Sequence, residues 1–120
     1  MSKILYAEDN EDNIYVTTSH LTRAGYNIIL AKNGLEAVNI AKSEKPALIL
    51  MDVGLPIIDG FQATKILKAD FETSKIPIIM LTAHVLVTDQ EKAKDCGADD
   101  FETKPINTKS LLATIAKYIK

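Results

Sequence analysis

The sequence lacks the features on which most secreted, membrane and nucleic-acid-binding proteins depend. Its 120 residues include one cysteine, Cys96, so no internal disulfide can form and a cytoplasmic location is expected. The apolar runs, such as residues 47–51, are far shorter than the ~20 residues of a membrane-spanning helix, and the N-terminus shows no secretory signal. The net charge of -2 gives no basic surface for nucleic acid.

Linkers, repeats and low-complexity segments are also missing from the sequence. A chain of 120 residues matches the usual size of one domain, ~100–150 residues. We therefore predict a single domain over residues 1–120, with one core and no membrane insertion.

Short and continuous apolar runs predict the strands. They lie at residues 4–7, 28–31, 47–51 and 78–81, and a weaker fifth candidate at 99–103 is typical of an edge strand. Runs that are continuous rather than alternating indicate strands covered on both faces, as in a parallel sheet.

Stripes of apolar residues with helical spacing lie between these runs. Leu35 and Val38 belong to one stripe, Phe61, Leu67 and Phe71 to another, and a thin stripe predicts a helix over 86–96. With helices also expected near residues 14–24 and 111–119, the order is βαβαβαβαβα. This order predicts an α/β fold, a doubly wound parallel sheet of five strands flanked by five helices.

Polar side chains follow four of the five predicted strands. They are Glu8 and Asp9, Asp52, Thr82 and Lys104. Each residue alone is more often a helix cap, a turn former or a surface charge. Ligands bind at the carboxyl edge of such sheets, so the set as a whole predicts one site there.

The chemistry of this set favours phosphoryl transfer. Three carboxylates held close together repel one another unless a cation intervenes, and oxygen ligands suit Mg2+, or Mn2+ in its place. Asp52 is then the candidate nucleophile on phosphorus. Lys104 offers a positive charge and Thr82 a hydroxyl donor to the phosphoryl oxygens.

Six segments together resemble bacterial response-regulator receiver domains, of the kind that includes single-domain chemotaxis regulators. They are residues 4–10, 33–37, 52–60, 77–83, 97–101 and 104–105, and the resemblance covers essentially the whole chain. It implies the flavodoxin-like sheet order 2-1-3-4-5. It also implies a phosphoacceptor in a two-component system or phosphorelay, not an enzyme, with a histidine kinase or histidine phosphotransferase and a downstream protein as partners.

The resemblance assigns roles to individual residues. Asp52 is implied to accept the phosphoryl group from a phosphohistidine. Glu8 and Asp9 are implied to hold Mg2+ with Asp52 and the backbone carbonyl of Gly54, with Asp9 and Asp52 as direct ligands. Thr82 and Lys104 are implied to contact the phosphoryl group, and the bond before Pro105 is often cis in this family.

Three positions vary within the family and predict how this chain differs from its relatives. Gly54 and His84 lie at the rim of the site, and we expect them to set the lifetime of the acyl phosphate by admitting or excluding water. Phe101 stands where many relatives have Tyr, and is expected to switch with Thr82. The expected switching surface is the helix over 86–96, the fifth strand and the last helix.

Other functions stay open at this point. Since the predicted elements use the whole sequence, we expect a stand-alone receiver, with a fragment of a hybrid kinase or larger regulator as the alternative. An aspartyl-phosphate hydrolase similar to haloacid dehalogenases needs a second acid where Gly54 stands. A flavodoxin-like ligand binder needs a phosphate loop where Glu8 and Asp9 stand. A receiver that is never phosphorylated conflicts with the intact set of site residues.

Overall fold

The computed structural model describes residues 2–83, 91–92 and 94–119 of the chain. The elements are β1 (Lys3–Ala7), α1 (Glu11–Arg23), β2 (Asn27–Ala31), α2 (Gly34–Glu44), β3 (Leu48–Asp52), α3 (Gly60–Ala69), β4 (Ile78–Thr82), β5 (Asp100–Thr103) and α5 (Thr108–Tyr118).

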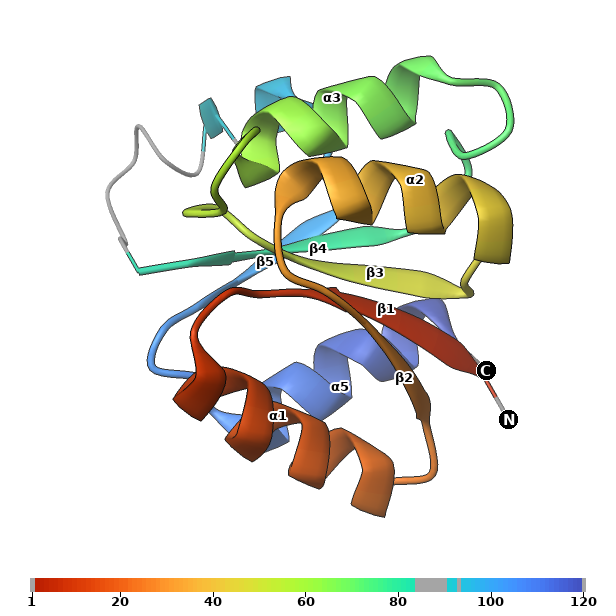
Figure 1. Ribbon diagram of the computed structural model, residues 1–120. Coiled ribbons are helices and arrows are strands. Elements are labelled where there is room, and N and C mark those ends of the chain that lie inside the picture. The colour runs from red at the N-terminus through yellow and green to blue at the C-terminus, as the bar shows by residue number, and fades with distance from the viewer. Residues whose placement is uncertain (1, 84–90, 93, 120) are drawn as a thin grey trace.

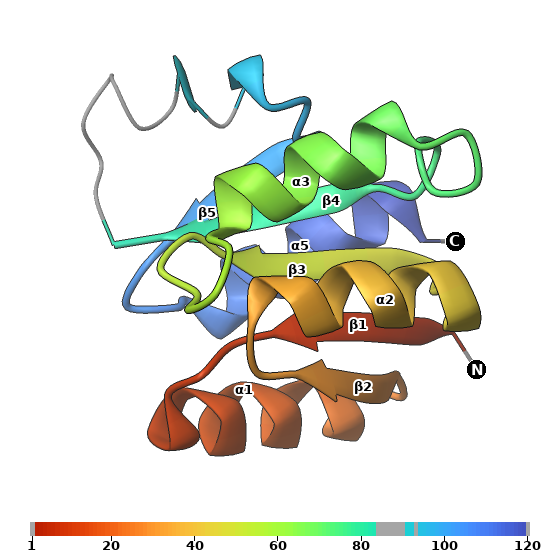
Figure 2. The ribbon, with the colours of Figure 1, turned by 45° about the horizontal axis from the view of Figure 1, so that its top comes forward.

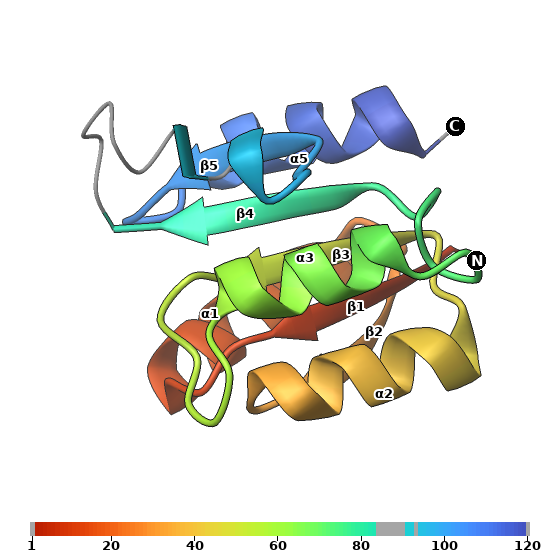
Figure 3. The same ribbon diagram turned by 90° about the horizontal axis from the view of Figure 1, so that it is seen from above.

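The five strands form one parallel sheet in the order β2-β1-β3-β4-β5. Helices α2 and α3 cover one face and α1 and α5 cover the other (Figures 1 and 2). Figure 3, seen from above, shows α3 lying along the sheet near β3 and α2 lying nearer to β1 and β2. The α/β class and the order 2-1-3-4-5 are therefore confirmed.

Two apolar clusters form the core, one on each face of the sheet. Leu5, Ile49 and Met80 belong to the cluster under α2 and α3, whereas Ile4 and Leu50 belong to the cluster under α1 and α5. Neighbouring residues of a strand point to opposite faces, so each central strand supplies both clusters. All residues of β3 and β4 are buried, which explains their continuous apolar sequence.

The helices begin at side-chain caps that the sequence supplies. Asn10, Asn33, Asp59 and Asn107 each accept a hydrogen bond from a backbone N–H in the first turn, which satisfies a donor that has no partner within the helix. No helix in the described residues is both long and apolar enough to cross a membrane.

The structure corrects the predicted helices at two points, and a third prediction, the helix over 86–96, lies largely outside the described residues. The described residues contain four helices rather than five, because the helix predicted over 86–96 falls largely on residues outside the described ranges. Helix α3 ends at Ala69, so Phe71 lies beyond it and is 94% exposed. Leu35 is half-exposed, because α2 buries the stripe of Gly34, Ala37, Val38 and Ala41 instead.

Candidate functional site

An acidic cluster forms where β1 and β3 end. Ala7 pairs with Met51 in the parallel register, so Glu8 and Asp52 come next on adjacent strands. Glu8, Asp9 and Asp52 each place a carboxylate oxygen within 4.8 Å of the others. Glu8 and Asp52 are buried, whereas Asp9 is exposed.

Lys104 brings a positive charge into this cluster from the residue after β5. Its Nζ lies 2.7 Å from Asp52 Oδ1 and 2.9 Å from Glu8 Oε1. The backbone N–H of Lys104 donates to the carbonyl oxygen of Thr82 at 2.7 Å, which ties the lysine to the end of β4. The Lys104–Pro105 peptide bond is cis.

Burial and charge shift the pKa values of the paired groups. Burial raises the pKa of Asp52, and the negative charge of Glu8 adds to this, while the hydrogen bond from Lys104 acts against it. For Lys104, burial acts to lower the pKa, but the contacts with Asp52 and Glu8 outweigh it and raise the pKa. Lys104 therefore stays charged near neutral pH, and Asp52 holds a proton more readily than a free aspartate does.

Both oxygens of the Glu8 carboxylate accept hydrogen bonds. Oε1 accepts from Lys104 and, at 3.4 Å, from the side-chain amide of Asn13. Oε2 accepts from the backbone N–H of Asp9 at 3.2 Å and of Asn10 at 3.4 Å. The Glu8 side chain is 1% exposed, and these hydrogen bonds compensate for the loss of water around its charge.

The remaining predicted residues lie around the cluster. Thr82 ends β4 next to β3 and is buried. Gly54 is exposed, and a Cβ added there lies 4.0 Å from Asp52 Oδ2. Phe101 is half-buried and packs on the core cluster under α2 and α3. His84 lies outside the described residues.

The loop after Asp52 is held closely against its surroundings. Gly60 begins α3 so near the backbone of Asp52 that an added Cβ would collide with the Asp52 carbonyl oxygen. Its N–H donates to the carbonyl oxygen of Val53 at 2.9 Å. Ile57, at the outer side of this loop, has a φ of 74°, a left-handed conformation that is costly for a β-branched residue. The contacts of Gly60 thus hold the end of this loop against Asp52 and Val53, where the loop begins.

The donor set of this site fits a hard divalent cation. In the described part of the chain, three carboxylates share one ammonium group, that of Lys104. Mg2+ is bound by one or two carboxylates with water completing its coordination. Asp9 and Asp52 are suited to this, because Asp9 is exposed and Asp52 has its second oxygen on the side of Gly54.

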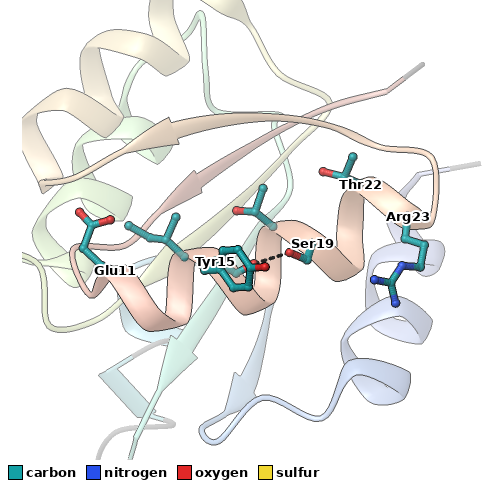
Figure 4. Close-up of a pocket in the computed structure, with 7 residues that line it drawn as sticks. Glu11, Tyr15, Ser19, Thr22 and Arg23 are labelled. Carbon is teal, nitrogen blue, oxygen red and sulfur yellow. Dashed lines mark hydrogen bonds between the residues drawn. The ribbon is translucent and has the colours of Figure 1, made fainter.

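A larger hollow lies elsewhere, along the outer flank of α1. Its volume is about 680 Å³, and its lining includes Glu11, Tyr15, Ser19, Thr22 and Arg23, which Figure 4 shows along one side of the helix. The Ser19 hydroxyl donates to the carbonyl oxygen of Tyr15 at 2.7 Å, so it is used within the helix. Glu8, Asp9 and Asp52 do not line this hollow, and the candidate site lies at the carboxyl edge of the sheet instead.

Two residues that help to hold the Glu8 side chain in place were not predicted from the sequence. Asn13 donates to its carboxylate, and the buried hydroxyl of Tyr6 contacts the carbonyl oxygen of Asn13 at 3.5 Å. Burial raises the pKa of Tyr6 strongly, and the nearby charges of Glu8 and Asp52 add to this. A signal for Asn13 was available, because Asn10 caps α1 and a residue three positions after a cap lies next to it.

Sequence comparisons agree with this geometry. The family model described as response regulator receiver domain matches residues 4–116. Protein PilH of Pseudomonas aeruginosa is 41% identical over 115 residues, which cover 96% of this chain and 95% of that protein. The polar-differentiation response regulator DivK of Brucella anthropi is 37% identical over 116 residues, covering 97% of this chain and 94% of that protein.

One similar solved structure bears on the metal site. The receiver domain of a Pseudomonas aeruginosa sensor histidine kinase superimposes with a TM-score of 0.92 at 35% identity, covering 98% of this chain and 97% of that one. That structure is described as having a magnesium ion coordinated in its active-site cleft.

Proposed function

This chain belongs to the response regulator receiver domains of two-component signalling, and from that membership we propose that Asp52 is its phosphoacceptor. Receiver domains are signalling phosphoacceptors rather than classical enzymes. The observation that carries the proposal is the position of Asp52, buried at the end of β3 and paired with Lys104 at 2.7 Å.

The proposed reaction is transfer of a phosphoryl group from a phosphohistidine to Asp52. A carboxylate oxygen of Asp52 attacks phosphorus, the phosphorus–nitrogen bond breaks, and the imidazole leaves with the electron pair. Lys104, already within reach of Asp52, stabilises the negative charge on the phosphoryl oxygens. Thr82, at the end of the next strand, is the proposed hydroxyl donor to the same group.

Receiver domains bind Mg2+ at an acidic site, and the acidic cluster fits this ion. We propose Asp9, Asp52 and the carbonyl oxygen of Gly54 as its protein ligands, with Glu8 supporting them; Mn2+ is proposed to substitute for it. When bound, the cation supplies positive charge to the phosphoryl oxygens. The protein supplies the placement, since Glu8 and Asp52 are held by strands and by Lys104.

Phosphorylation is proposed to change the surface formed by segment 86–96, β5 and α5. Phe101 of β5 supports this proposal. Its half-buried ring packs on the core cluster under α2 and α3, so a change in that packing would alter the surface at β5. Movement of Thr82 toward a phosphoryl group alters the neighbour of β5, since Thr82 pairs with Thr103. Amide NMR shifts confined to the acidic cluster after phosphorylation, with none on this surface, would contradict the proposed switch.

The proposed partners are a histidine kinase or histidine phosphotransferase and a downstream protein, acting in the cytoplasm. Receiver domains in general interact with both kinds of partner. We propose that residues 1–120 form one receiver domain; its curated relatives in the comparison have nearly the same length.

The test is labelling of the pure protein with a small phosphodonor and Mg2+, followed by intact mass measurement. We expect one labile phosphoryl group that is absent in the presence of a chelator and in Asp52→Asn. The matched control is Asp12→Asn, which changes an exposed acid of α1 and should label normally. If the wild-type chain gains no phosphoryl group from any donor, the proposed function is wrong.

A further inference from the structure

A closed ring of hydrogen bonds lies at the turn between β1 and α1. The backbone N–H of Asn10 donates to Glu8 Oε2 at 3.4 Å. The backbone N–H of Asn13 donates to Asn10 Oδ1 at 3.0 Å, and the side-chain amide of Asn13 donates to Glu8 Oε1 at 3.4 Å. The ring thus begins and ends on the carboxylate of Glu8 and encloses the turn that carries Asp9.

The ring is anchored on two sides. Glu8 is 1% exposed and paired with Lys104 at 2.9 Å, so its carboxylate has little freedom. The buried hydroxyl of Tyr6 donates to the carbonyl oxygen of Asn13 at 3.5 Å. Several of these hydrogen bonds are long, so each contributes little alone. Together they restrict the turn between β1 and α1 to one geometry.

Asp9 depends on this ring for the position of its backbone. Its N–H donates to Glu8 Oε2 at 3.2 Å, while its side chain is exposed at the acidic cluster. The ring therefore fixes where the Asp9 side chain starts and leaves its carboxylate accessible. Removing a partner that orients a metal ligand commonly lowers metal affinity by roughly 10–100-fold.

We infer that Asn13 is a positioning residue for the Mg2+ site, acting through Glu8 on the backbone of Asp9. The inference rests on the proposed function, since it needs Asp9 to bind the cation. Asn13 itself is exposed at the first turn of α1 and contacts Glu8 rather than Asp9 or Asp52 through its side chain. Its role is to close the ring.

The test compares Mg2+ affinity in Asn13→Ala and in the wild-type protein, by titration of Mg2+ followed through amide NMR shifts. We expect the Kd to rise about tenfold, the lower end of the range for residues that orient metal ligands. We also expect faster hydrogen exchange at the amides of Asp9 and Asn10 before Mg2+ is added. Asn39→Ala, the same change at an exposed position of α2, should leave both unchanged.

A purely structural role of Asn13 predicts a different result. In that case Asn13→Ala lowers the Tm, less the part that the higher helix propensity of alanine offsets, and leaves the Kd for Mg2+ unchanged. Asn13→Gln keeps the amide and should recover part of the affinity. If Asn13→Ala does not fold, Asn13→Ser, which is too short to reach Glu8, takes its place with the same expected loss.

The outcomes separate this inference from the proposed function. A wild-type protein that binds no Mg2+ contradicts the proposed function itself. A wild-type protein that binds Mg2+, with an unchanged Kd in a folded Asn13→Ala or Asn13→Ser, contradicts only the role of Asn13. An equal loss in Asn39→Ala contradicts that role too, because the effect is then not specific to the ring.

Discussion

The two ends of the sheet each hold a partly buried lysine, and the two lysines have different surroundings. At the amino end of β4, Lys68 Nζ donates to the carbonyl oxygens of Ser74 at 3.1 Å and Ile76 at 2.8 Å, and to Asp99 Oδ2 at 2.8 Å. Its three donors thus meet three acceptors and one negative charge. The Asp99 oxygen also accepts from the N–H of Ile78 at 2.8 Å.

At the carboxyl end, Lys104 faces more negative charge than it can neutralise. Its ammonium group contacts Glu8 and Asp52, with Asp9 close by. Here an acid has a raised pKa and the charges do not balance within the described residues. A balanced pair serves the fold, whereas an unbalanced cluster has capacity for a cation and a phosphoryl group.

The largest expected effect is that of Lys104→Met on phosphorylation. Without the ammonium group, nothing replaces its stabilisation of the phosphoryl oxygens, and we expect labelling to slow by about 100-fold, as for loss of one such donor. The initial rate of labelling with a small phosphodonor at saturating Mg2+ measures this. Lys109→Met, at an exposed lysine of α5, is the control, and equal rates in both variants would show that Lys104 has no special role.

Lys68→Met should lower the stability of the fold and leave phosphorylation unchanged. It leaves the carbonyl oxygens of Ser74 and Ile76 and the carboxylate of Asp99 without this donor, so we expect the free energy of unfolding to fall by about 2 kcal/mol. Urea denaturation checks this, with Lys65→Met, an exposed lysine of the same helix, as control. We expect normal labelling; a loss of labelling with unchanged stability would refute the division between the two ends.

Stabilisation by Mg2+ should depend on pH. Because the pKa of Asp52 is raised in the folded protein, its ionised form costs stability above that pKa, and the cost is absent below the unfolded value of about 3.9. Mg2+ at ten times its Kd should stabilise the protein by about 1.4 kcal/mol near neutral pH, and less as the pH falls and Asp52 is protonated.

Thermal unfolding with and without Mg2+ at several pH values measures this effect. Asp52→Asn should lose most of the Mg2+-dependent shift in Tm at every pH. A shift that grows as the pH falls would contradict the assignment of Asp52 as a ligand.

Gly54→Asn should have the smallest effect, on the lifetime of the acyl phosphate. A Cβ at this position lies 4.0 Å from Asp52 Oδ2 and meets nothing else nearby, so a side chain can cover the phosphoryl group without disturbing the fold. We expect dephosphorylation to slow by a few fold, measured as loss of the phosphorylated mass with time. Unchanged rates in both Gly54→Asn and His84→Ala would show that the rim does not control the lifetime.

The sheet and the acidic cluster were predictable because both follow from strand positions. Continuous apolar runs located the buried strands, and residues that follow parallel strands must meet at one edge. That argument brings Asp52 and Lys104 together from positions 52 residues apart, and they lie 2.7 Å apart. The strand positions predicted that both residues lie at one edge of the sheet, whereas the sheet order came from the family resemblance and their direct contact was not predicted.

Residues whose place depends on local hydrogen bonding were not predictable in this way. The stripe that included Phe71 ignored Asp70, whose carboxylate accepts the N–H of Glu72 at 2.9 Å and helps to turn the chain. Asn13 is polar and exposed, so no apolar pattern marks it, and its only sequence signal is its place three residues after the cap Asn10. The left-handed conformation of Ile57 is unexpected for a β-branched residue, and nothing in its own side chain predicts it.

The most direct test of the account is to locate the phosphoryl group in the chain. Borohydride reduction of the freshly labelled protein converts an acyl phosphate of aspartate to homoserine, which peptide sequencing by mass spectrometry then locates. The account predicts homoserine at position 52 and an unmodified Asp9. Homoserine at Asp9, Asp59 or any other acid, with Asp52 intact, would contradict it.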